Sequence, residues 1–381
     1  MKILHIITDL EIGGAEMMLC RLLERLDAQR FQATVLALSD RGPLADCLEA
    51  LRVPVYAANL RGNPYRALVT LRQVLRQTQP DLLQGWMYHG NLVAQLLALS
   101  WRVCGVSQRN SRLPCCLSIH NALYSLRSEK RLTQLVLYSS GWLSPLAAAT
   151  IFVSRVSAEQ HYALGYSRSR SLIIPNGVDC DRFMPDPAAR DQVRQALELP
   201  KSALLIGLVA RFHPQKDHGN FLQAAAHLAA QQPEAYFLLC GAGVEPRNPV
   251  LSAQVQALGL TERVRLLGDR SDIPHLTAAL DIACLASNSE AFPLVVLEAM
   301  ACGVPCVVTA VGDAPWVVGE TGKVVPPRDP AALAAACQHL ATLGATGRQR
   351  LGQAARDRAC QMFSLQATVQ RYEALYQQFS A

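Results

Sequence analysis

The sequence predicts an α/β fold made of two doubly wound parallel sheets in series. Three observations support this prediction. The chain is 381 residues long, which is more than one ordinary core organises. Short β-branched runs alternate along it with helix-length segments, and the alternation breaks once near the middle. Strands that are apolar throughout and separated by helices are typical of parallel βαβ units.

Candidate strands in the first half of the chain lie at residues 3–8, 33–39, 54–59, 81–86, 116–121, 149–154 and 171–176. The helix expected after the first of them carries leucines at the i, i+3, i+4 and i+7 positions of one apolar face, namely Leu19, Leu22, Leu23 and Leu26. A single apolar face is what a helix needs to pack on one side of a sheet.

A stretch rich in Pro, Asp and Gly at residues 175–191 interrupts the pattern and predicts a linker. The alternation then restarts, with candidate strands at residues 204–210, 236–241, 264–268, 282–287, 305–310 and 322–327. We therefore expect an N-terminal domain over residues 1–178 and a C-terminal domain over residues 179–363. Because ligands of such sheets bind beyond the carboxyl ends of the strands, we expect these ends to line one cleft.

Composition and charge narrow the class of protein. Half of the residues are hydrophobic, and the twelve cysteines show no regular spacing, which predicts a reduced, cytoplasmic compartment. The apolar run at the N-terminus is too short for a signal peptide and predicts a buried strand.

The charge is unevenly distributed along the chain. Residues 1–178 contain 19 Lys and Arg but 11 Asp and Glu. This imbalance favours a phosphate-bearing partner or an anionic membrane surface, with a merely solvated basic face as the alternative. We expect no nucleic-acid partner.

One uncharged segment, residues 132–154, is long enough to span a bilayer, but Ser, Gly and Pro residues break it in the middle. We interpret it as a helix followed by a core strand, with a helix face that touches a membrane. The basic residues expected to contact an acceptor or the membrane surface are Arg109, Arg112, Arg127, Lys130 and Arg131.

Glycines and one histidine mark candidate sites at strand ends. Gly13 and Gly14 open the first helix and would let backbone amides approach a phosphate or sugar, although a tight turn alone would also need glycine. His120 ends a predicted strand, where a polar group already satisfied by neighbours is the alternative to a functional one. Gly241 begins a Gly-Ala-Gly loop that lacks the full dinucleotide fingerprint and predicts close approach to a ligand or to a neighbouring chain segment.

Arg211 and Lys216 follow a predicted strand in one strand-to-helix loop. Two cations at this spacing can clamp a diphosphate, with the guanidinium forming paired hydrogen bonds and the ammonium acting as a point charge. Two solvated cations on a loop are the alternative interpretation.

The segment SNSEAFPLVVLEAMACG contains Glu290 and Glu298, with no cation nearby in the sequence to pair with either. Pro293 is expected in the first turn of a helix, which places Glu298 in its second turn. A carboxylate accepts up to four hydrogen bonds and donates none, so it suits vicinal diols. We expect one glutamate to contact the sugar end of a ligand and the other to accept two hydroxyls.

Together with ARFHPQKD, GGAE and IIPNGVDCDRF, this segment resembles the retaining glycosyltransferases of family 4, which have the GT-B fold of two Rossmann-like domains facing across a cleft. The resemblance covers essentially the whole chain and is to enzymes of bacterial surface polysaccharide and lipopolysaccharide synthesis. It implies a nucleotide-sugar donor, here expected to be UDP-linked, in the C-terminal domain. It also implies that the helix over residues 364–381 crosses back to the N-terminal domain, which binds the acceptor.

The resemblance further implies roles for individual residues. Arg211 and Lys216 would bind the diphosphate, Glu290 the sugar hydroxyls and Glu298 the ribose, while His120 would contact the donor sugar. Backbone approach or amides near the donor would come from Gly13, Gly14, Gly241, Ser289, Leu294, Val295 and Val296. His120, Glu290, Arg211 and Lys216 form the expected catalytic set. Ala291 stands where the family often has glycine, which leaves the sugar open.

The expected reaction is metal-independent transfer with retention onto a lipid-linked glycan, a lipopolysaccharide or a capsule acceptor, at the inner face of the plasma membrane. A soluble acceptor is an alternative, as are a non-catalytic nucleotide-sugar-binding protein and a sugar-nucleotide epimerase. No cofactor and no metal are expected. Asp179 and Asp181 mimic a metal motif but lie in the linker, and Cys302 and Cys306 lack a second ligand pair.

Overall fold

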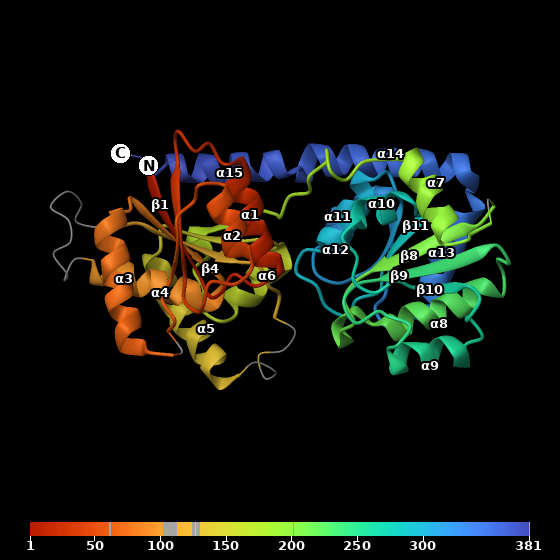
Figure 1. Cartoon of the computed structure of the whole chain (residues 1–381), viewed down its shortest axis with the longest axis horizontal. Helices are drawn as coiled ribbons and strands as arrows, with labels where there is room; N and C mark the ends of the chain where they lie inside the picture. The colour runs from red at the N-terminus through yellow and green to blue at the C-terminus, as the bar shows by residue number, and fades with distance from the viewer. Residues whose placement is uncertain (61, 102–112, 124–125, 127–129, 201, 381) are drawn as a thin grey trace. The chain divides into compact units, whose positions relative to one another are not determined.

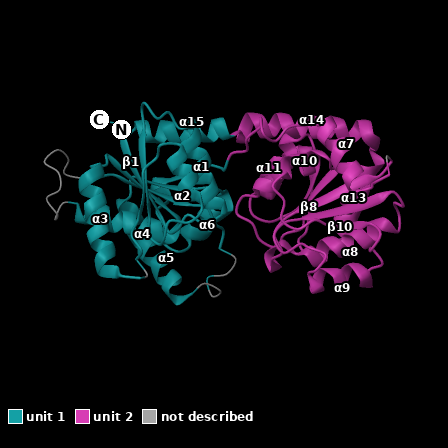
Figure 2. Cartoon of the chain, viewed as in Figure 1, with its two compact units in different colours: residues 1–176, 365–381 teal, residues 177–364 magenta. Residues whose placement is uncertain are grey.

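The computed structural model describes the chain except for residues 61, 102–112, 124–125, 127–129, 201 and 381. It divides into two compact units, which are coloured separately in Figure 2. Unit 1 contains residues 1–176 and 365–381, and unit 2 contains residues 177–364.

Unit 1 is built on a seven-stranded sheet in the order β3-β2-β1-β4-β5-β6-β7, with every neighbouring pair parallel. Figure 1 labels β1 and β4, which are neighbours in this sheet. The strands are β1 (Lys2–Ile7), β2 (Gln32–Ala37), β3 (Val55–Ala57), β4 (Leu82–Trp86), β5 (Cys115–Ile119), β6 (Ala149–Phe152) and β7 (Ser171–Ile173). All seven predicted strands form. The strand order reverses between β1 and β4, which is where doubly wound sheets place their ligands.

The helices of unit 1 are α1 (Gly14–Arg25), α2 (Leu44–Ala50), α3 (Pro64–Thr78), α4 (Met87–Ser100), α5 (Arg131–Leu143), α6 (Arg155–Tyr162) and α15 (Leu365–Gln377), with short 3-10 turns η2 (Ser144–Leu146) and η3 (Arg168–Arg170). Leu19 and Leu22 of α1 are buried in one core with Tyr372 and Tyr376 of α15. The last helix therefore completes the core of the first unit. Among the helices described, none is long and apolar enough to cross a membrane.

Unit 2 repeats the plan with a six-stranded parallel sheet in the order β10-β9-β8-β11-β12-β13. Its strands are β8 (Leu204–Val209), β9 (Ala235–Cys240), β10 (Val264–Leu266), β11 (Ile282–Leu285), β12 (Cys306–Thr309) and β13 (Gly322–Val325). Here the order reverses between β8 and β11. The prediction of two Rossmann-like parallel-sheet domains is confirmed.

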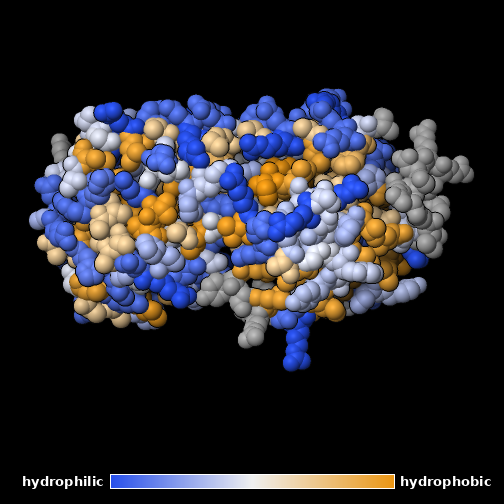
Figure 3. Space-filling view, turned by 180° about the vertical axis from the view of Figure 1, so that it is seen from behind, coloured by the Kyte–Doolittle hydropathy of each residue, from blue (hydrophilic) through white to orange (hydrophobic). Residues whose placement is uncertain are grey.

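The helices of unit 2 are α7 (Pro187–Ala196), α8 (His218–Ala229), α9 (Pro249–Ala257), α10 (Ile273–Ala278), α11 (Leu294–Ala301), α12 (Ala314–Val318), α13 (Pro330–Thr342) and α14 (Gly344–Phe363), with 3-10 turns η4 (Pro214–Lys216) and η5 (Gly319–Thr321). On the face of the chain shown in Figure 3, hydrophobic residues (orange) are interspersed among hydrophilic ones (blue).

The linker predicted over residues 175–191 is too long, because α7 begins at Pro187. Its start is fixed by the Asp186 carboxylate, which accepts a hydrogen bond from the Ala189 amide at 2.9 Å. Asp179 likewise accepts from the amides of Asp181 and Arg182, each at 3.1 Å. Local turn and cap formation thus accounts for Asp179 and Asp186.

Candidate functional site

The loop that follows β11 is held in place at the carboxyl end of the sheet of unit 2. Ser287, two residues beyond the strand, donates from its hydroxyl to Glu290 Oε1 at 2.7 Å, and its carbonyl accepts from Thr309 Oγ1 at 2.7 Å. Gly312 has a positive φ of 52°, and a Cβ there would collide with the Glu290 carbonyl. The backbone around Glu290 is therefore fixed from the neighbouring strand β12.

Glu290 is paired with Lys216 of the loop after β8. Lys216 Nζ lies 2.5 Å from Glu290 Oε1, and the two side chains are 23% and 12% exposed. The two loops are also joined through the backbone, since the Asn288 amide donates to the Gln215 carbonyl at 2.7 Å. No cation is near Glu290 in the sequence, but β8 and β11 are neighbours in the sheet, which brings Lys216 to it from 74 residues away.

Arg211 begins the same loop as Lys216, two residues after β8. Its side chain is exposed and has no hydrogen bond or ion pair among the described residues. The neighbouring Gly-Ala-Gly loop packs on the backbone of this segment: the Phe212 amide donates to Ala242 O at 2.8 Å, and a Cβ at Gly241 would collide with the Ala210 carbonyl. Of the two expectations for Gly241, close approach to a neighbouring chain segment is the one confirmed.

The first turn of α11 presents unpaired amides beside this loop. Within the described part of the chain, the amides of Leu294 and Val295 have no hydrogen-bond partner, whereas the Val296 amide donates to Pro293 O at 3.1 Å. Pro293 is the N-cap rather than a first-turn residue, because its ψ of 96° is not helical. Ser289 lies partly exposed in the same loop. Helix N-termini carry partial positive charge, so this end of α11 attracts anions.

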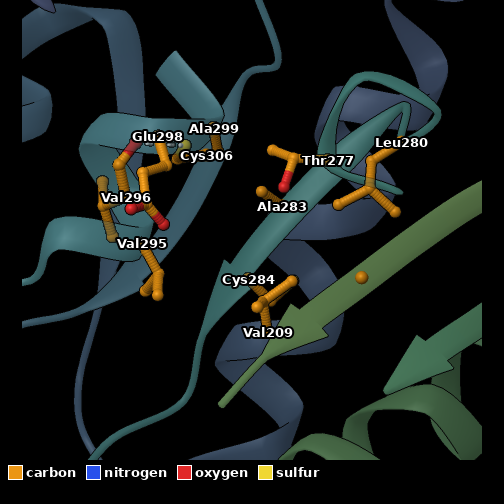
Figure 4. A pocket seen from close by; sticks show the side chains of 11 residues that line it. Val209, Thr277, Leu280, Ala283, Cys284, Val295, Val296, Glu298, Ala299 and Cys306 are labelled. Carbon is orange, nitrogen blue, oxygen red and sulfur yellow. Dashed lines mark hydrogen bonds between the residues drawn. The ribbon is translucent and has the colours of Figure 1, made fainter. Parts of the chain in front are cut away.

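Glu298 lies in the second turn of α11, as predicted, and lines a pocket at the point where the strand order reverses (Figure 4). Figure 4 shows Glu298 and Val295 on one side, with Thr277 and Leu280 across from them. The other lining residues are Gly207, Val209, Ala283, Cys284, Val296, Ala299 and Cys306. Sequence reasoning missed Thr277 and the strand residues, because no local signal relates them to Glu298.

His120 of unit 1 directly follows β5 and stacks on Trp86, with ring centroids 4.9 Å apart and planes inclined by 19°. Tyr372 of α15 also stacks on Trp86, at 6.2 Å, and Trp86 Nε1 donates to His5 Nδ1 at 3.1 Å. Neither ring nitrogen of His120 has a hydrogen-bond partner among the described residues. Burial lowers the pKa of His120 to about 4, with nearby Asn176 opposing the shift, so the imidazole is neutral near pH 7.

Gly13 and Gly14 stand at the N-terminus of α1, but for different reasons. A Cβ at Gly13 would collide with the Glu16 carboxylate, whereas a Cβ at Gly14 would meet nothing within 4 Å. Burial raises the pKa of Glu16, its own amide opposes this by hydrogen bonding, and Asp9 adds to it. Neither the turn nor the packing requires the second glycine, so it leaves open space at the start of the helix.

Of the five basic residues predicted to contact an acceptor or the membrane surface, two lie in the described part of the chain. Lys130 and Arg131 are exposed at the start of α5, and Arg109, Arg112 and Arg127 lie outside the described residues. Cys302 and Cys306 are buried, and burial raises the pKa of each thiol to about 12, so both pack as neutral thiols. Within the residues described, no group of three or more His, Cys, Asp or Glu side chains is arranged to hold a metal ion.

Two family models match the chain. Glycosyltransferase Family 4 matches residues 12–182, and Glycosyl transferases group 1 matches residues 189–358. Two curated relatives are each 27% identical over 81% of this chain and 79% of their own length. They are EpsF of Bacillus subtilis and the UDP-Gal:alpha-D-GlcNAc-diphosphoundecaprenol alpha-1,3-galactosyltransferase of Escherichia coli.

Among solved structures, Anabaena Alr3699/HepE in complex with UDP-glucose matches with a TM-score of 0.82 at 25% identity, covering 99% of this chain and all of the other. The lipopolysaccharide outer core galactosyltransferase WaaB shares the fold, with a TM-score of 0.73 at 17% identity over 99% of both chains. The fold is therefore that of GT-B enzymes. This chain belongs to the glycosyltransferases, with a family 4 region in its first half and a group 1 region in its second.

Proposed function

We propose that the protein transfers a sugar from a UDP-linked donor to a lipid-linked glycan, with retention of the anomeric configuration and without a metal ion. One observation carries this proposal. At the point where the strand order of unit 2 reverses, Arg211 and the Lys216–Glu290 pair lie on loops joined by a backbone hydrogen bond, and the unpaired amides of Leu294 and Val295 follow. This combination suits a sugar attached to a diphosphate.

The cationic groups would stabilise the leaving group. As the bond to the sugar breaks, negative charge accumulates on the diphosphate, and Arg211, Lys216 and the positive end of α11 supply the compensating charge. Lys216 Nζ uses one donor on Glu290 and keeps others for phosphate oxygens. This chemistry gives the protein a metal-independent way to activate the donor.

Glu290 is proposed to hold the sugar hydroxyls rather than to attack the anomeric carbon. Both hydrogen bonds described for its carboxylate, from Lys216 and from Ser287, end on Oε1. A carboxylate already engaged by an ammonium and a hydroxyl is a weaker nucleophile, which favours direct attack by the acceptor hydroxyl from the leaving-group face. Glu298 is proposed to accept hydrogen bonds from the ribose, and neutral His120 to contact the donor sugar.

The acceptor assignment draws on the named relatives. The Escherichia coli relative acts on a diphosphoundecaprenol-linked sugar, and the Anabaena structure contains UDP-glucose. A lipid-linked diphosphate acceptor also agrees with the excess of Lys and Arg in residues 1–178. We propose a cytoplasmic enzyme that works peripherally at a membrane.

Isothermal titration calorimetry in EDTA tests the donor proposal. We expect UDP to bind the full chain at least about ten-fold more tightly than uridine, because a charge-assisted hydrogen bond contributes roughly 1.5–3 kcal/mol. GDP and ADP serve as controls for the base. Equal affinity for UDP and uridine, or binding only with added divalent cations, would contradict the proposed phosphate site.

A further inference from the structure

Helix α5 of unit 1 is apolar on two faces. Its buried side, with Val136, Leu137, Ser140 and Gly141, packs on the unit. On the opposite side, large apolar side chains point to solvent: Leu132 is 65% exposed, Leu135 63%, Tyr138 49% and Trp142 80%, and Leu146 of the following turn is 68% exposed. A surface helix ordinarily carries polar residues on this side. These five residues are called the α5 face below.

The α5 face continues into a groove beside it. Leu143 and Leu146 line this groove together with Leu99, which is exposed on α4, and with the side chain of Arg170. The two helices that line the groove are joined by a buried pair of hydrogen bonds between Gln95 and Ser140. The exposed apolar surface is thus wider than one helix.

Three cationic side chains lie near this surface. Lys130 and Arg131 begin α5, and Arg170 lines the groove; within the described part of the chain, none of these side chains has a hydrogen bond or ion pair. Elsewhere on the unit, exposed arginines such as Arg41 and Arg168 pair with glutamates. From residue 130 to residue 158 the sequence contains no acidic residue. The α5 face therefore combines apolar, aromatic and cationic side chains.

We propose that the α5 face, with Lys130, Arg131 and Arg170, docks the protein on an anionic phospholipid bilayer. Apolar residues insert into the boundary between headgroups and acyl chains, Trp and Tyr favour that depth, and the cations contact lipid phosphates. Burial of apolar area and electrostatic attraction to anionic lipids both strengthen such binding. This inference rests on the proposed function only in linking the membrane to a lipid-linked acceptor.

Tryptophan fluorescence reports on this surface directly. Of the four tryptophans, Trp86 and Trp101 are buried, Trp316 is half-buried and Trp142 is exposed. On addition of vesicles containing phosphatidylglycerol, we expect the emission maximum to move to shorter wavelength, and Trp142→Phe to abolish the shift. An unchanged spectrum of the wild-type chain would overturn the proposal.

Vesicle co-sedimentation with matched variants separates lipid docking from other uses of the face. Arg131→Gln should lower binding about five-fold at low salt, the effect expected for the loss of one cation near an anionic surface. Leu135→Ser with Trp142→Ser should reduce it more. Val250→Ser with Leu343→Ser, which removes exposed apolar side chains from unit 2, is the control and should bind normally. Equal binding by all variants would contradict the assigned surface.

Two further readouts keep this inference distinct from the proposed function. UDP binding by the α5 variants should equal that of the wild type, so a loss of lipid binding with normal UDP binding supports the docking surface alone. Sedimentation velocity should give the same oligomeric state for wild type and variants. A dimer that dissociates on Leu135→Ser would instead identify the face as a contact between two copies and overturn the proposal.

Discussion

Glu290 and Glu298 lie eight residues apart but have different surroundings. Glu290 is paired with Lys216 and accepts from Ser287, whereas Glu298 lines an apolar pocket beside Val295 and Thr277. The sequence predicts both glutamates as ligand contacts, because a carboxylate within an apolar segment is unfavourable unless it binds a partner. It could not predict the pairing, since Lys216 is 74 residues away and only the sheet order makes the two loops neighbours.

Replacing Glu290 should therefore affect turnover more than nucleotide binding. We expect Glu290→Gln to lower kcat about 100-fold, because a fixed polar contact to the reacting sugar is lost, and to leave the Kd for UDP within a few-fold. Steady-state kinetics and calorimetry measure the two effects. Glu298→Ala is the matched comparison and should instead weaken UDP binding about ten-fold. Turnover of Glu290→Gln close to that of the wild type would refute the assigned contact.

Arg211 provides a second test at the scale of single residues. Because it has no partner among the described residues, its removal should cost little stability and act on the diphosphate alone. We expect Arg211→Ala to weaken UDP binding about ten-fold or more while leaving uridine binding unchanged. A parallel loss for both ligands would show that the residue supports the fold of the loop instead.

At the scale of elements, the sequence predicted every strand of both sheets, because buried parallel strands are nearly continuous apolar runs. The predicted ends of helices were less accurate where a capping residue determines them. Helix α7 starts inside the predicted linker, and Pro293 is the N-cap of α11 rather than a residue of its first turn. The Trp86–Tyr372 stack was not predicted, because it joins β4 to a helix at the other end of the chain. Contacts between residues this far apart in the sequence follow from the topology of the fold and leave no local pattern in the sequence.

Substitutions of Gly312 and Gly14 by alanine should have different effects on stability. Gly312→Ala forces a Cβ against the Glu290 carbonyl at positive φ, so we expect it to destabilise the protein by about 1–3 kcal/mol. Gly14→Ala has open space and should leave the melting temperature unchanged while lowering turnover, if donor phosphates approach this helix end. Thermal unfolding and kinetics of both variants check this. Equal melting temperatures for the two would contradict the described contact.

At the scale of the whole molecule, three histidines of unit 1 with buried ring nitrogens should make the protein sensitive to acid. Burial lowers the pKa of His5 to about 3 and those of His120 and His161 to about 4, from an ordinary value of 6.5. Between these values the unfolded chain binds protons that the folded chain does not, so stability falls as the pH falls from about 6.5 toward 4.

Denaturant titrations across this range measure that dependence. Near pH 5 the histidines alone predict a slope approaching about three protons, or ~4 kcal/mol per pH unit. His161→Gln should remove about a third of the slope, because a neutral amide does not titrate there. A free energy of unfolding that is constant between pH 6.5 and 4.5 would show that these side chains are not buried as described.

We propose that the chain transfers a sugar from UDP with retention, using its own cations rather than a metal. The most direct test incubates the protein, in EDTA, with α-linked UDP-hexoses and a short-chain diphosphate-linked acceptor, and determines the anomeric configuration of the product by NMR. We predict an α-linked product and released UDP, with no transfer by the Lys216→Ala variant. A β-linked product, or UDP binding without transfer to any acceptor or to water, would contradict the account.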